Sequence, residues 1–244
     1  MAGEERDERK AWATVYSDAL TYLAPGLLIG LLCGGLVGGV GGRLAMFLLR
    51  LTSDESLHGL ETDDGFKIGS FTGDTVFLVL VTMFLGVLGG LIYVGIRQWL
   101  PEHLRPLSFG LLTGTIGGAL IIRPDGIDFT LLEPLSLAVV MFVALPTVYG
   151  VAVSVIVEKL DRSRALEHSR WRWVAILTLI PLAPTGPLGL AFLLLLAIGI
   201  AANRSGRVAR FWRSAPVTWI ARAGLAMSVA VSGWVLVRDI SEVL

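Results

Sequence analysis

Five glycines recur at every fourth position between residues 25 and 42, and this row constrains the fold more than any other feature. Residues four apart on a helix lie over one another, so the row forms a groove without side chains. In water such a helix would be poor, because each glycine costs about 0.5–1 kcal/mol relative to alanine. In lipid the backbone must close its own hydrogen bonds, and the groove lets another backbone approach closely. The row therefore predicts a helix-packing seam at Gly26, Gly30, Gly34, Gly38 and Gly42.

The composition predicts an all-α integral membrane protein, because 54% of the residues are hydrophobic and 16% are charged. The 20 basic residues balance the 20 acidic ones, so no global field would recruit nucleic acid, and no nucleic-acid partner is predicted. Cys33 is the single cysteine, the three histidines lie apart in polar segments, and no catalytic motif occurs. We therefore predict a protein that is not an enzyme and that has no metal site and no cofactor.

The apolar stretches predict a polytopic bundle of six or seven transmembrane helices. A cytoplasmic leader is expected at 1–19, and a transmembrane core of four spans at 20–157. A basic cytoplasmic loop at 158–173 follows, and 174–244 holds a proline-broken hairpin, an arginine-rich loop and the last span. The individual spans are predicted, from length and hydropathy, at 23–43, 75–96, 107–122, 135–157 and 216–237.

Basic residues give the predicted orientation. Residues 1–19, 97–106 and 158–172 together carry ten Lys or Arg, whereas the loops 52–74 and 123–134 carry two. Cytoplasmic loops hold the excess of basic residues, so we predict a multi-pass protein of the plasma (inner) membrane with a cytoplasmic N-terminus. The apolar stretch 174–202 leaves two topologies open, one kinked crossing or a tight hairpin of two helices. The arginines at 203–213 favour the hairpin, and hence seven helices.

The first four spans are interpreted as two tandem helical hairpins. The sequence GLLCGG at 30–35 resembles GLLTGT at 110–115, and each half runs from a glycine-rowed helix through an acidic turn to an apolar return helix. Glycine-rich spans also resemble one another without duplication, so a true repeat stays a hypothesis. Spans one and three run in the same direction and can pack side by side; a homo-oligomeric seam is the alternative. The second row consists of Gly110, Gly114 and Gly118.

Weak points near the middle of the return helices indicate a candidate binding path. Pro146 has no N–H and interrupts the hydrogen-bond ladder of its helix. When the second predicted hairpin is aligned on the first, Gly86 lies opposite Thr147. Interruptions at matching places in two repeats point to a transporter's binding site, although proline and glycine are also common in membrane helices generally. The predicted path consists of Thr82, Gly86, Thr113, Pro146, Thr147 and Tyr149.

Acidic residues dominate the two predicted outer loops. A vestibule lined in this way would concentrate cations and repel anions. The alternative is that these are ordinary loop acids that serve turns and surface ion pairs. The predicted outer mouth consists of Asp63, Asp64, Asp125 and Glu133.

Four arginines spaced by three residues form a ladder before the last span. This spacing keeps the guanidinium groups on one side of a helix, where they suit anionic lipid headgroups of the cytoplasmic leaflet. Membrane lipids are therefore predicted partners. The ladder consists of Arg204, Arg207, Arg210 and Arg213.

Two functions fit this sequence. The first is a channel- or transporter-like protein for a cation or a small neutral solute. The alternative is a non-catalytic accessory or assembly subunit of a larger membrane complex, because small surface residues and few polar groups suit that role equally well. Either function is compatible with a homo-oligomer.

Overall fold

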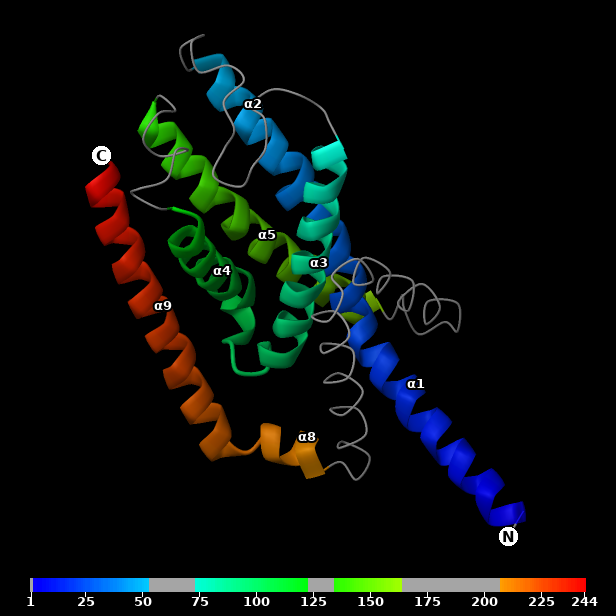
Figure 1. Cartoon of the computed structure of the whole chain (residues 1–244). Helices are drawn as coiled ribbons and strands as arrows, with labels where there is room; N and C mark the ends of the chain where they lie inside the picture. The colour runs from blue at the N-terminus through cyan, green and yellow to red at the C-terminus, as the bar shows by residue number, and fades with distance from the viewer. Residues whose placement is uncertain (1, 53–72, 123–133, 164–206) are drawn as a thin grey trace.

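The computed structural model describes residues 2–52, 73–122, 134–163 and 207–244, and these ranges are helical and contain no strand. Figure 1 shows the arrangement, with α9 at the outer edge of the bundle beside α4. In chain order the elements are α1 (Ala2–Cys33), the π-helix η1 (Gly34–Gly41), α2 (Gly42–Thr52), α3 (Gly73–Ile96), the 3₁₀ turn η3 (Glu102–Leu104), α4 (Arg105–Ile121), α5 (Leu135–Ser163), α8 (Arg207–Trp212) and α9 (Ala215–Val243).

Within the described ranges, five helical stretches are long and apolar enough to cross a membrane, so the chain has the build of a multi-pass membrane protein. The predicted mouth and the stretch 174–202, on which the choice between six and seven helices depends, lie outside the described residues. The stretches are Asp18–Leu49, Val76–Ile96, Glu102–Ile121, Leu135–Ser163 and Ala215–Val243.

Helices α1 and α3 meet with their backbones in direct contact. A Cβ atom added at Gly26 would lie 2.7 Å from the carbonyl oxygen of Gly90. One added at Gly86 would lie 2.6 Å from the Cα of Gly34, and one at Gly30 would collide with the Gly86 carbonyl oxygen. Glycines on both helices therefore allow an approach that no other residue would permit.

The second row packs in the same way against its own return helix. A Cβ atom at Gly110 would lie 2.5 Å from the Val151 side chain, and one at Gly150 would lie 2.9 Å from the Phe109 carbonyl oxygen. A Cβ at Gly114 would meet the Thr147 side chain, and one at Gly118 would lie 3.0 Å from Leu236 of α9. Both hairpins are thus closed by glycine contacts between their two arms.

The two rows do not pack against each other. Helix α1 packs chiefly on α3 and α5, whereas α4 packs on α5 and α9. The expectation that spans one and three lie side by side is therefore wrong. Each return helix is the antiparallel neighbour along the chain and brings glycines of its own, such as Gly86 and Gly150, so it fits each groove more closely.

Gly42 is not part of the seam, which ends at Gly38. A Cβ atom at Gly42 would have no atom within 4 Å, whereas one at Gly38 would lie 3.0 Å from the Thr82 side chain. The cause is the π-helix η1, in which hydrogen bonds span five residues. This wider turn means that residues four apart no longer lie over one another, and Gly42 is rotated out of the row.

Candidate functional site

Half of the predicted path lies where α1, α3 and α5 meet. The Tyr149 hydroxyl donates a hydrogen bond of 2.6 Å to the carbonyl oxygen of Gly86 and so links α5 to α3. The Thr82 hydroxyl lies under Gly38 and Gly39 and donates to the Val79 carbonyl oxygen at 3.0 Å. Thr82, Gly86 and Tyr149 therefore form one group, which we call the central cluster.

The other half lies in the seam between α4 and α5. The Thr113 hydroxyl donates to the Phe109 carbonyl oxygen at 2.9 Å, and the Thr147 hydroxyl donates to the Val143 carbonyl oxygen at 2.8 Å. The Pro146 ring faces Gly117 of α4, where an added Cβ would lie 2.7 Å away. These hydroxyls are used by their own helices. The six predicted path residues are thus divided between the central cluster and the seam between α4 and α5.

Several predicted site residues lie outside the described residues, namely Asp63, Asp64, Asp125, Glu133 and Arg204. Of the rest of the arginine ladder, Arg207 begins α8, and Arg210 is exposed on it. Arg213 follows α8 and reaches a pocket that the sequence did not predict.

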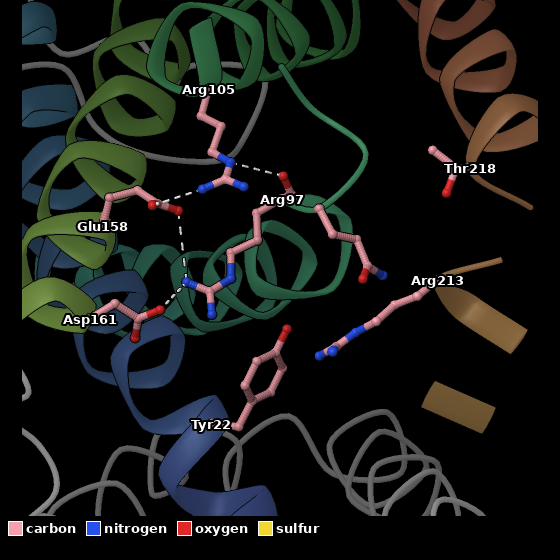
Figure 2. A pocket seen from close by; sticks show the side chains of 8 residues that line it. Tyr22, Arg97, Arg105, Glu158, Asp161, Arg213 and Thr218 are labelled. Carbon is pink, nitrogen blue, oxygen red and sulfur yellow. Dashed lines mark hydrogen bonds and ion pairs between the residues drawn. The ribbon is translucent and has the colours of Figure 1, made fainter. Parts of the chain in front are cut away.

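This pocket, the ionic pocket, has a volume of about 440 Å³ and lies at the end of the bundle that the basic-residue count assigns to the cytoplasm. Figure 2 shows its charged side chains converging from the turn after α3, from α4 and α5, and from the turn after α8, with Tyr22 of α1 beside them. It brings together residues from five separate parts of the sequence. They are Tyr22, Arg97, Gln98, Arg105, Glu158, Asp161, Arg213 and Thr218.

Glu158 is the centre of an ionic network on one wall of the pocket. Its carboxylate accepts a 2.9 Å hydrogen bond from the buried Tyr93 hydroxyl and a 2.9 Å bond from the Arg105 guanidinium. Arg97 lies 3.7 Å from the same carboxylate and donates a hydrogen bond to Asp161. Burial is the largest single influence on the pKa of Arg97 and would lower it, but the hydrogen bond and charge of Asp161, together with Tyr22, outweigh burial and raise that pKa. Arg97 therefore stays charged.

Aromatic side chains next to Gln98 and Arg213 in the sequence fix the turns that carry these two residues. The Trp99 and Trp212 rings lie 4.6 Å apart, and the Trp212 indole N–H donates to the Gly95 carbonyl oxygen at 3.0 Å. The Arg222 guanidinium of α9 donates to the Trp99 carbonyl oxygen at 2.9 Å. These contacts attach α8 and the start of α9 to the turn between α3 and α4, and so position Arg213.

From the sequence, Arg97 and Arg105 were predicted only as basic residues of a loop, and no role was predicted for Glu158 or Asp161. Helix α5 continues to Ser163, beyond the predicted end of its span at residue 157. Glu158 and Asp161 are three residues apart and thus share one face of this extension. Two carboxylates on one face, directly after an apolar span, were the signal available in the sequence.

Replacement of Tyr149 by Phe tests the bond between the hairpins. We expect Tyr149→Phe to lower the free energy of unfolding by about 1 kcal/mol, because the hydrogen bond to Gly86 is lost while the ring is kept. Unfolding in detergent with increasing denaturant measures this change. Tyr22→Phe is the matched control, since the Tyr22 hydroxyl donates to the Val94 carbonyl oxygen at 3.2 Å within one hairpin. If Tyr149→Phe and the parent protein had the same free energy of unfolding, the hydrogen bond would contribute nothing to stability.

The polar groups of the central cluster and of the ionic pocket are hydroxyls, carbonyl oxygens and guanidinium–carboxylate pairs. Within the described ranges, no group of three His, Cys, Asp or Glu side chains is placed to hold a metal ion. Comparison with protein-family models, with curated proteins and with solved structures found no match to the chain.

Proposed function

We propose that the chain is a transporter- or channel-like membrane protein, without enzyme activity, that passes a cation or a small neutral solute. In this proposal the α1–α3 hairpin and the α4–α5 hairpin are two bodies that move against each other. The single observation that carries it is the contrast between the contacts within the hairpins and those between them. Rigid-body rocking of one repeat against another is the usual motion of transporters built in this way.

Contacts within a hairpin resist sliding. Gly30 and Gly86 touch through their backbones, so no flexible side chain lies between α1 and α3 at this point. In the α4–α5 seam, glycines receive short side chains of the opposite helix, as Gly114 receives Thr147. Each glycine-seamed hairpin is therefore suited to move as one unit.

Contacts between the hairpins include polar bonds that water or a solute could replace. Tyr149 of α5 donates to Gly86 of α3, and Tyr93 of α3 donates to Glu158 of α5. Ile29 and Val153 belong to an apolar cluster that the two hairpins share. Side chains, and not touching backbones, thus fill the space between the hairpins, and this interface is the one suited to open.

Two irregular helix segments meet beside the central cluster. A Cβ atom at Gly41 in the π-helix would lie 2.9 Å from the side chain of Leu145, the residue before Pro146. Interrupted helices that face each other at mid-depth are typical of solute sites, and π-segments often occur at functional sites. The central cluster offers the hydroxyls of Thr82 and Tyr149 and the carbonyl of Gly86. Such neutral oxygen atoms suit a cation or a small uncharged solute.

Flux into proteoliposomes tests this function. Purified protein would be reconstituted, and K⁺ and Na⁺ flux would be followed with a potential-sensitive dye, and glycerol entry by light scattering. We expect flux of at least one probe above that of empty vesicles, and we expect Tyr149→Phe to change its rate because the bond between the hairpins is removed. Ser228→Ala, on the exposed face of α9, is the control and should leave the rate unchanged. Absence of all flux with folded, monodisperse protein would contradict the proposal.

The accessory-subunit function is kept as a second candidate because of α9. This helix is the least covered of the five candidate spans, and Trp219, Ile220 and Trp234 are each at least 70% exposed on it. A partner subunit, a second copy or lipid could cover this face. No flux together with co-purification of a membrane protein at fixed stoichiometry would favour the accessory function.

A further inference from the structure

Among the residues that the structure describes, the charges that line the ionic pocket do not cancel. Arg97, Arg105 and Arg213 face two carboxylates, Glu158 and Asp161. Both carboxylates already accept hydrogen bonds from arginines on their own wall, Glu158 from Arg105 and Asp161 from Arg97. The positive charge in excess is therefore that of Arg213, and the pocket as a whole favours an anion.

Arg213 differs from the other two arginines of the pocket in its side-chain contacts. Figure 2 shows its guanidinium directed across the pocket towards Tyr22 and Arg97. Among the residues that the structure describes, its side chain makes no salt bridge, whereas Arg97 and Arg105 both do. A guanidinium presents donors in a planar fork that matches two oxygens of a phosphate. Thr218 and Gln98 line the same space, and the Gln98 amide adds neutral donors.

The position of the pocket suits a group at the level of the lipid headgroups. Its residues lie at the ends of apolar helices, close in sequence to Trp99 and Trp212, whose rings are in contact. Aromatic residues gather at this depth of membrane proteins. A volume of about 440 Å³ is enough for a phosphorylated headgroup.

We propose that the ionic pocket is a specific site for one phosphate-bearing anion, held by the Arg213 guanidinium with Gln98. The phosphate belongs either to an anionic phospholipid of the adjoining leaflet or to a soluble phosphate compound. This site is distinct from the central cluster and does not depend on solute transport. It differs from general attraction of lipid to the arginine ladder, because it assigns the binding to Arg213 and not to its neighbour Arg210.

The test uses the full-length protein in neutral detergent. Short-chain phosphatidylglycerol, phosphatidylcholine and inorganic phosphate would each be titrated, with tryptophan fluorescence as the signal because Trp99 and Trp212 adjoin the pocket. We expect saturable, one-to-one binding of phosphatidylglycerol. Arg213→Gln should weaken it about tenfold, whereas Arg210→Gln should leave it unchanged. Arg213 is exposed, so Arg213→Gln should keep the thermal transition of the ligand-free protein.

Each outcome decides one point. Competition by inorganic phosphate at comparable concentration would assign the site to a soluble phosphate compound, and its failure to compete would assign it to a phospholipid; either supports the site. Equal losses in Arg213→Gln and Arg210→Gln would overturn the proposal in favour of diffuse attraction to the ladder. Non-saturable binding, or equal affinity for phosphatidylcholine, would also overturn it. A lack of solute flux in the proteoliposome experiment would contradict the transport function but not the anion site.

Discussion

Alanine in place of Gly30 is expected to push α1 away from α3 and to destabilise the protein by about 1–3 kcal/mol. The new Cβ atom would collide with the carbonyl oxygen of Gly86 and would lie 3.1 Å from the Cα of Gly90. All of the atoms in its way belong to the backbone, so no side chain can turn aside to make room. Unfolding in detergent, followed by circular dichroism or by loss of the monodisperse peak on heating, would measure the loss.

Gly42→Ala is the matched control for this prediction. Gly42 belongs to the same sequence row, but a Cβ atom added there has no neighbour within 4 Å. We expect Gly42→Ala to be neutral, or stabilising by up to about 1 kcal/mol, because alanine favours a helix over glycine. Equal destabilisation by the two variants would mean that helix propensity, and not contact between α1 and α3, explains the glycines. A Gly30→Ala protein as stable as the parent would mean that this part of the row faces lipid.

The sequence was sufficient to predict an all-helical fold with several helices long and apolar enough to cross a membrane, because these depend on local composition and on helical periodicity. The first glycine row was visible in it as well. The sequence did not lead to the partner of that row. Gly86 and Gly90 are themselves four residues apart in the return helix, and this shorter pattern was the available signal. The π-helix could not be predicted, since a change in hydrogen bonding over Gly34–Gly41 leaves the composition unchanged. It is this change that removes Gly42 from the seam.

Less of the candidate sites than of the fold could be predicted from the sequence. Thr82 and Thr147 were assigned to one path because both are polar and lie near the middle of a span. Their positions around α5 depend on how each helix is rotated, and the structure places them in different seams. The ionic pocket joins residues as far apart in sequence as Tyr22 and Arg213, which only tertiary packing brings together. Counting charges on each side of the membrane predicts orientation, but it cannot pair Arg105 with Glu158.

Alanine in place of Glu158 is expected to cost about 2–3 kcal/mol, the second large effect. The Glu158 side chain is 15% exposed and accepts hydrogen bonds from Tyr93 and Arg105. Its removal leaves the buried Tyr93 hydroxyl without this acceptor and leaves the Arg105 guanidinium with the Arg97 carbonyl oxygen, at 3.1 Å, but without its carboxylate partner. Lys159→Ala is the matched control, because Lys159 is the next residue and is exposed. Denaturant unfolding of both variants in the same detergent measures the difference.

A double-mutant cycle with Tyr93→Phe separates this effect from a general weakening of α5. Tyr93→Phe alone should cost about 1 kcal/mol, because it breaks the bond to Glu158 and leaves one carboxylate oxygen without this donor. In the Glu158→Ala background the same change should cost nothing or be stabilising, since the hydroxyl no longer has an acceptor to lose. Strictly additive losses would show that Tyr93 and Glu158 do not act as a pair. The bond would then contribute nothing to holding α3 against α5, and the hairpins would be joined at this end by Arg97 and Asp161 instead.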